Sequence, residues 1–354
     1  MDAERETAAE VGEFALIDRL AGALAEVGAA SAGDLLGIGD DAAAWWPAPG
    51  ARALITTDSL IAGVHFRLDW TGWRDLGHKA LAVNVSDIAA MGGRPRLAVV
   101  SLGLTGREPV AGLLDLYRGL GELAARRGLA VAGGDVVRSP DRLGLHVTVV
   151  GESWPDLGGR ILTRAGARPG EALAVGGPLG LSAAGLVLLA GHAAGAGPVD
   201  LAAAAPQERA LLAAHLRPEP RVALGRLLVA AGASAAMDLS DGLFGDLPKV
   251  LVASGVGARV DERRLPVAAA VRALFPDEWL DLATRGGEDY ELLFTLPPAS
   301  LGATTRAAER IGATITPIGT ILQPDGAPGV IEVLDLDGLR RTIESGAFDH
   351  FAPS

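Results

Sequence analysis

The chain has 354 residues, 49% of them hydrophobic, and is long enough to build two domains with ordinary cores. Its 43 acidic and 31 basic residues give a formal net charge of −12, which disfavours a nucleic-acid partner because binding to a phosphate backbone depends on Lys and Arg. The absence of cysteine excludes disulfides, a thiolate nucleophile and a cysteine-ligated zinc. It favours a cytoplasmic protein, and no run of about 18 uninterrupted apolar residues predicts a membrane span.

Residues 1–152 are predicted to form a first domain. Apolar residues recur at helical spacing from Phe14 to Val27, which predicts an amphipathic helix over 13–27. After a Gly/Asp-rich segment, β-type runs at 53–58, 97–104 and 145–150 alternate with helical stretches at 75–91 and 109–127. This alternation is typical of an α/β or α+β layer structure.

Residues 153–354 are predicted to form a second α/β domain. The segment 153–170 concentrates Pro, Gly and Arg without periodicity and marks the boundary. A strand-like run follows at 172–175, then Ala/Leu-rich helices to about residue 232, and then strand and helix alternate to the C-terminus.

The segment 37–42 reads GIGDDA, which matches the glycine pattern of a dinucleotide-binding fingerprint. However, the adjacent carboxylates of Asp40 and Asp41 would repel a pyrophosphate, and the next residues do not read as a long helix. Two alternatives stay open: an Asp-rich turn, or a site where these residues hold a cation that in turn binds phosphate. The P-loop pattern is absent, because neither Lys79 nor Lys249 follows a glycine.

Three more aspartates of the first domain occupy positions that suit ligand binding. Asp58 ends a β-type run, and Asp135 follows two glycines, which would allow close backbone approach to a ligand. Asp87 lies in an otherwise apolar helix, where a buried carboxylate is costly unless it is paired.

The second domain contributes two polar segments. Asp238 and Asp241 flank Ser240, although Asp238 or Ser240 could instead cap a helix that begins near residue 241. The segment 286–290 reads GGEDY and precedes an apolar strand, so turn chemistry is the alternative explanation of its glycines.

Electrostatics explains why acids from several segments would act at one site. Two unit charges 4 Å apart interact by about 1 kcal/mol in water but by about 4 kcal/mol at an effective dielectric constant of 20, so bringing two phosphates together is costly. Several Mg²⁺ ions can offset this cost. Because each Mg²⁺ takes only one or two carboxylates, a multi-metal site must draw its acids from several segments.

The ordered motifs of the chain resemble those of the thiamine-monophosphate kinase family, within the aminoimidazole ribonucleotide synthetase-like superfamily. The matching segments are GEFALI at 12–17, GIGDDAA at 37–43, TTDSLIAGVHF at 56–66, KALAVNVSDIAAMGGRP at 79–95, GGD at 133–135, LTRAGARPG at 162–170, MDLSDGL at 237–243, GGEDYELLFT at 286–295 and FDHF at 348–351. They follow one another over nearly the whole chain, and together they are highly specific.

The resemblance implies a ferredoxin-like N-terminal α/β domain that binds ATP and Mg²⁺ and forms a homodimer. A second, C-terminal α/β domain would complete the active site. It further implies that ATP donates its γ-phosphoryl group to thiamine monophosphate, giving thiamine diphosphate and ADP, with several Mg²⁺ ions as cofactors.

The resemblance also assigns roles to individual residues. The Mg²⁺ shell would comprise Asp41, Thr56, Thr57, Asp58, Asp87, Asp135, Asp238 and Asp241. The nucleotide contacts would be Tyr117, Gly134, Asp135, Arg164 and Ser240, and the thiamine contacts His65, Glu288 and Phe348. Asp58, Asp135 and Arg164 would carry the catalytic roles.

The implied chemistry agrees with the residues present. The acceptor is a phosphate oxygen that is already largely deprotonated at neutral pH, so the reaction needs no strong general base. Positioning and charge neutralisation remain, and Arg164 is a candidate for an additional cation. The cationic thiazolium ring would suit the carboxylate of Glu288 and the aromatic face of Phe348.

Other members of the superfamily provide the alternatives. Selenophosphate synthetase and the hydrogenase-maturation dehydratase use a reactive Cys or selenocysteine, which this chain lacks. An aminoimidazole ribonucleotide synthetase-type ligase and a catalytically silent nucleotide-binding regulator remain as alternative functions.

Overall fold

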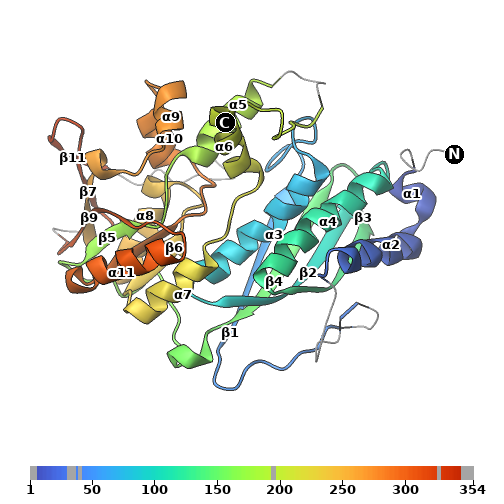
Figure 1. Ribbon diagram of the computed structural model, residues 1–354, viewed down its shortest axis with the longest axis horizontal. Helices are drawn as coiled ribbons and strands as arrows, with labels where there is room; N and C mark the ends of the chain where they lie inside the picture. The colour runs from blue at the N-terminus through green and yellow to red at the C-terminus, as the bar shows by residue number, and fades with distance from the viewer. Residues whose placement is uncertain (1–5, 30–36, 39–41, 193–196, 325–327, 344–354) are drawn as a thin grey trace. The chain divides into compact units, whose positions relative to one another are not determined.

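We describe residues 6–29, 37–38, 42–192, 197–324 and 328–343 of the chain in a computed structural model (Figure 1). These residues belong to two units. Unit 1 comprises Met1–Ile88, Arg94–Gly159 and Gly191–Asp200, and unit 2 comprises Ala89–Gly93, Arg160–Ala190 and Leu201–Ser354. By contacts, therefore, residues 153–159 and 191–200 belong with the first unit.

A four-stranded sheet forms the centre of unit 1. Its strands are β1 (Ala53–Ile61), β2 (Arg94–Leu104), β3 (Ala130–Arg138) and β4 (Gly144–Glu152). They lie in the order β1-β4-β2-β3, in which β4 is antiparallel to both neighbours and β2 is parallel to β3. Alternate strand residues are fully buried, for example Val147 and Val149 on β4, so one face of the sheet builds the core.

Helices cover that face of the sheet. Unit 1 contains α1 (Ala8–Val11), α2 (Glu13–Glu26), α3 (Trp73–Ala90) and α4 (Val110–Arg127), and Figure 1 shows α3 and α4 side by side over the strands. The amphipathic pattern predicted a helix over 13–27, and α2 confirms it: Leu16, Leu20 and Leu24 are buried at helical spacing.

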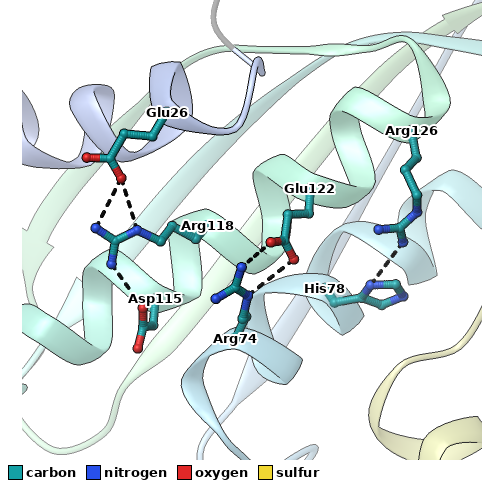
Figure 2. Close-up of polar contacts among 7 residues, drawn as sticks. All are labelled: Glu26, Arg74, His78, Asp115, Arg118, Glu122 and Arg126. Carbon is teal, nitrogen blue, oxygen red and sulfur yellow. Dashed lines mark hydrogen bonds and ion pairs between the residues drawn. The ribbon is translucent and has the colours of Figure 1, made fainter.

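Ion pairs cross the outer surface of these helices (Figure 2). Arg118 of α4 lies between Glu26 of α2 and Asp115, with nitrogen–oxygen distances of 3.1 and 3.0 Å. Arg74 of α3 makes two contacts with Glu122 of α4 in the same view. Because these side chains are partly exposed to solvent, the pairs contribute little to stability.

Unit 2 is built around a seven-stranded sheet in the order β11-β10-β7-β9-β5-β8-β6. The strands are β5 (Ala172–Val175), β6 (Ala235–Asp238), β7 (Gly257–Asp261), β8 (Leu292–Leu296), β9 (Thr316–Leu322), β10 (Ile331–Leu334) and β11 (Arg340–Ile343). The helices are α5 (Leu181–Ala190), α6 (Pro206–Leu216), α7 (Val222–Ala231), α8 (Leu243–Ser254), α9 (Ala269–Leu274), α10 (Trp279–Arg285) and α11 (Pro298–Arg310). Its core includes the fully buried Leu247, Val260 and Leu293.

Both units confirm the predicted mixed α/β class. One strand differs from expectation. No β-type run was predicted around residues 133 and 134, but these glycines lie within β3, which runs parallel to β2. Across the described ranges, the structure contains no helix with the length and apolar character needed to traverse a bilayer.

Candidate active site

Thr56, Asp58 and Asp87 meet inside unit 1. Thr56 and Asp58 share one face of β1, since alternate residues of a strand point the same way. Thr56 Oγ1 donates to Asp87 Oδ2 of α3 over 2.5 Å. Burial raises the pKa of Asp58 to about 6, and the negative charge of Asp87 adds to the rise. The two carboxylates repel each other and form a pair that a bound cation would stabilise.

Thr57 points to the opposite face of the same strand. There its Oγ1 donates to the carbonyl oxygen of Val147 at 3.1 Å and accepts from Thr148 Oγ1 at 3.0 Å. The structure thus brings Thr56 together with Asp58 and Asp87 but keeps the Thr57 hydroxyl apart.

A cavity of about 520 Å³ lies in unit 1, where β3, α2 and α4 contribute to its walls. Three of the predicted nucleotide contacts, Tyr117, Gly134 and Asp135, line it, and Ile17 and Leu20 of α2 add apolar surface. Burial raises the pKa of the Tyr117 phenol, so this ring stays neutral at physiological pH. Cavities of roughly 300–1,000 Å³ with apolar walls and a few polar groups are typical of small-molecule sites.

Packing explains one of the predicted binding glycines. A Cβ atom on Gly134 would lie 1.9 Å from the carbonyl oxygen of Val100, so β3 needs glycine here to approach β2. Asp135 follows in register with Ser101 and is exposed. Asp135 therefore lies at the cavity and not with the residues on the face of β1 that carries Asp58.

His65 lies just after β1 in unit 1. Its Nδ1 accepts the backbone N–H of Ile61 at 3.1 Å, and the side chain is half-buried. This contact fixes the ring next to the end of the strand that carries Thr56 and Asp58.

Asp238, Ser240 and Asp241 occupy the turn between β6 and α8 in unit 2. Asp238 is buried at the end of β6. Helix α8 begins after Gly242 without a side-chain cap, so the alternative that Asp238 or Ser240 caps this helix is wrong. The turn is held from the other direction, because Asp246 Oδ2 accepts the backbone N–H groups of Ser240 and Asp241 at 2.9 and 2.8 Å.

Asp246 and Lys249 are two residues of this region that sequence reasoning missed. Lys249 Nζ donates to Asp241 Oδ2 at 2.6 Å and to Asp246 Oδ1 at 2.7 Å, and Asp246 is fully buried. Burial lowers the pKa of Lys249, but hydrogen bonds and charges from Asp241 and Asp246 outweigh it and raise the pKa overall. The spacing of Asp246 and Lys249 on α8 was the available signal, since residues three apart on a helix are neighbours.

The segment 286–291 lies against the same turn. Glu288 N donates to Ser240 O at 2.8 Å and Tyr290 N to Leu239 O at 2.9 Å. Glu288 and Tyr290 adopt φ values of +65° and +49°, a left-handed backbone that costs a non-glycine residue roughly 1–2 kcal/mol. Such strain persists only where surrounding contacts enforce it, and it concentrates at functional sites.

Two carboxylates anchor this strained segment. Asp289 accepts the backbone N–H groups of Gly180 at 2.7 Å and Ser182 at 3.1 Å, at the start of α5. Glu291 is buried and forms a two-contact ion pair with Arg221, one of them at 2.8 Å. Ser240 and Glu288, which the sequence assigns to ATP and to thiamine, are therefore neighbours in unit 2.

Three predicted residues remain. Arg164 of unit 2 is exposed, and its carbonyl oxygen accepts from Ser254 Oγ at 3.0 Å. Asp41 and Phe348 lie outside the described residues.

The donors present suit Mg²⁺, a hard cation that prefers carboxylate, hydroxyl and phosphate oxygens. No three carboxylate or imidazole groups within the part of the chain that the structure describes converge to hold a metal by themselves. A pair such as Asp58 and Asp87 still fits, because Mg²⁺ in phosphoryl-transfer sites takes one or two carboxylates and fills its shell with waters and substrate phosphates.

The chain matches a known protein family over most of its length. Residues 39–153 match the model of the AIR synthase related protein N-terminal domain, and residues 168–329 match that of the C-terminal domain. The chain is 38% identical to the thiamine-monophosphate kinase of Escherichia coli (strain K12) over 348 residues, covering 96% of this chain and 98% of the relative.

Two solved structures are similar over most of their length. The thiamine-monophosphate kinase from Stenotrophomonas maltophilia K279a has 38% identity and a TM-score of 0.78, covering 93% of this chain and 98% of the other. AaThiL complexed with AMPPCP and TMP has 31% identity and a TM-score of 0.73, covering 97% and 98%. On this evidence the chain belongs to the thiamine-monophosphate kinase family of AIR synthase related proteins.

Proposed function

We propose that this chain transfers the γ-phosphoryl group of ATP to the phosphate of thiamine monophosphate, releasing thiamine diphosphate and ADP. Its similarity to kinases of that name supports the proposal, as does the related AaThiL, which is complexed with AMPPCP and TMP. The observation that carries it is the cavity of about 520 Å³, because Tyr117, Gly134 and Asp135 of the predicted nucleotide set all line it.

Mg²⁺ is the proposed cofactor, bound as several ions. All eight proposed ligands are oxygen donors: Asp41, Thr56, Thr57, Asp58, Asp87, Asp135, Asp238 and Asp241. Bound Mg²⁺ would neutralise phosphate charge and align the two phosphates for in-line transfer. Thr57 would contribute through its main chain, since its hydroxyl donates to the carbonyl oxygen of Val147 on the opposite face.

The protein's own contribution is positioning and charge complementarity. Arg164, an exposed cation, would balance the charge that develops on the transferring phosphoryl group. Ser240 would contact the nucleotide from a turn that Asp246 and Glu288 hold in place. No residue needs to act as a strong base, because the attacking phosphate oxygen is already anionic.

For thiamine monophosphate, we propose contacts from His65, Glu288 and Phe348. A carboxylate such as Glu288 is complementary to the positive thiazolium ring. If Glu288 makes this contact, Glu288→Gln raises the KM for thiamine monophosphate and leaves the KM for ATP unchanged. An unaltered KM for thiamine monophosphate would contradict the assignment.

The direct test is to incubate the purified protein with Mg-ATP and thiamine monophosphate and to quantify both products. We expect ADP and thiamine diphosphate in equal amounts, and a strongly reduced yield of both with Asp135→Asn. ADP without thiamine diphosphate would indicate a different acceptor, as in the ligase alternative. Neither product would indicate a silent nucleotide-binding protein.

A homodimer through the sheet of unit 1 is the proposed assembly. Ile55 and Val137 support it, because they are 74% and 48% exposed on the face of the sheet opposite α3 and α4. Sedimentation of the wild type and of Ile55→Asp tests this: the variant should shift toward the monomer, and equal masses would contradict the proposal. The predicted cytoplasmic location stays a prediction.

A further inference from the structure

His215 is a buried histidine of α6 whose side chain reaches the strained segment of unit 2. Only 5% of its surface is exposed, and its Nδ1 lies 3.3 Å from Glu288 Oε2 and 3.1 Å from Ser182 Oγ of α5. The Glu288 side chain is 28% exposed, so the histidine contacts a carboxylate that solvent and ligands can still reach.

Close packing of α5 and α6 brings the histidine to this position. Gly185 of α5 faces α6, and a Cβ atom there would lie 2.2 Å from Leu211 O and 3.2 Å from His215 Cβ. Any larger residue would force the helices apart and carry the His215 ring away from Glu288. The contact is therefore built into the helix packing and does not depend on a mobile surface side chain.

The backbone of Glu288 is fixed independently of its carboxylate. Its N–H donates to Ser240 O, its φ is +65°, and the next residue, Asp289, holds the start of α5. Only the side-chain torsions remain to be set, and a buried partner at 3.3 Å restricts them. A functional carboxylate in a defined orientation needs such a supporting contact.

We propose that His215 is a positioning residue for the substrate: its Nδ1–H, shared between Glu288 Oε2 and Ser182 Oγ, holds the Glu288 carboxylate in the orientation that receives the thiazolium ring. The inference rests on the proposed function and deepens it. His215 itself contacts neither ATP nor the transferring phosphoryl group. Its loss should weaken thiamine monophosphate binding and spare the chemical step.

The first experiment is a double-mutant cycle in the full-length protein with His215→Leu, Glu288→Gln and the combined variant. We expect His215→Leu to raise the KM for thiamine monophosphate about tenfold, with kcat and the KM for ATP within about twofold of wild type. In the Glu288→Gln background, His215→Leu should add little, because the positioned charge is already gone. Fully additive effects on KM would overturn the proposal.

A matched pair of conservative variants separates positioning from packing. The amide of Asn can occupy the place of Nδ1, whereas that of Gln reaches the place of Nε2. His215→Asn should therefore keep the KM for thiamine monophosphate within about threefold of wild type, while His215→Gln should behave like His215→Leu. Equal KM values for the Asn and Gln variants would overturn the proposal even if His215→Leu does not fold.

A second buried histidine provides the control. His78 on α3 is 2% exposed, and its Nδ1 lies 3.5 Å from Arg126 (Figure 2). His78→Leu should leave the KM for thiamine monophosphate unchanged, and an equal rise there would overturn the specific role of His215. A wild-type protein that forms no thiamine diphosphate contradicts the proposed function, whereas normal turnover with an unchanged KM in folded His215→Leu contradicts only this inference.

Discussion

The acidic residues of the two units differ in the charges that lie near them. In unit 1, Asp58 is half-buried, and the charge that adds to the rise in its pKa is another carboxylate, Asp87. In unit 2, three acids near the Ser240 turn have a basic partner: Lys249 for Asp241, Arg221 for Glu291 and His215 for Glu288.

The difference separates a pair of like charges, which a bound cation would stabilise, from acids that already have a basic partner in the protein. A like-charged pair costs stability in the free protein, and a bound metal ion recovers that cost. When an acid is paired with a lysine or arginine, removal of one partner destabilises the fold, because it leaves a buried charge unpaired. The carboxylates of Asp58 and Asp87 should therefore matter for turnover, and those of Asp246 and Glu291 for the shape of the site.

Asp58→Asn is expected to give the largest effect, on activity alone. The substitution removes one of two repelling charges, so turnover should fall by at least about a hundredfold while the Tm at pH 8 stays equal or rises. ADP release and differential scanning calorimetry measure the two quantities. Mg²⁺ should raise the Tm of the wild type more than that of the variant. A near-normal rate would refute the metal-binding role of this residue.

Asp246→Ala should have the opposite signature, a loss of stability. The fully buried carboxylate accepts two backbone N–H groups and the Lys249 ammonium, so its removal should lower the free energy of unfolding by about 3–5 kcal/mol. Urea denaturation measures it. The matched control is Asp281→Ala, whose exposed pair with Arg285 should contribute less than about 1 kcal/mol. Equal losses in both variants would remove the distinction between buried and exposed acids.

Asp289 should make the stability of the protein depend on pH. Burial raises its pKa to about 7 from an ordinary value of 3.8, although the N–H groups of Gly180 and Ser182 lower it. The folded state therefore holds the proton more tightly, and the stability this provides is present below about pH 4 and lost as the pH rises through about 7. Relative to Asp289→Asn, the wild type should lose Tm between about pH 4 and pH 7. A constant difference between the two proteins would contradict the raised pKa.

The sequence predicted those parts of the fold that have a clean local period. The apolar spacing from Phe14 to Val27 predicted α2 within one residue at its C-terminal end, because one helix face is buried along its whole length. Strand β3 was not predicted, since its two glycines remove the alternating side chains and are equally typical of a turn. Residue 134 must be glycine because a Cβ atom there would clash with the neighbouring strand β2, a contact that only the folded sheet reveals.

For the candidate site, the sequence predicted which types of residue are present better than it predicted which side chains contact one another. Thr56, Asp58 and Asp87 were chosen by motif and do meet, but Thr57 was chosen with them and its hydroxyl faces away. Asp246 was missed although its spacing of three residues from Lys249 on α8 was a local signal, whereas His215 was missed because it belongs to an ordinary helix and acquires its partner through tertiary packing. No local period encodes contacts of this kind.

The ion pairs of Arg118 with Glu26 and Asp115 are exposed and should have the smallest effect on stability. Their side chains are 31%, 61% and 51% exposed, so solvent screens the interaction that Figure 2 shows. Arg118→Ala should lower the free energy of unfolding by only about 0.2–1 kcal/mol, and the difference should shrink in 1 M salt, where the Debye length is about 3 Å. Urea denaturation at low and high salt measures both effects. A loss as large as that of Asp246→Ala would mean that charge pairing stabilises this protein regardless of burial, and the contrast between the two units would then need another cause.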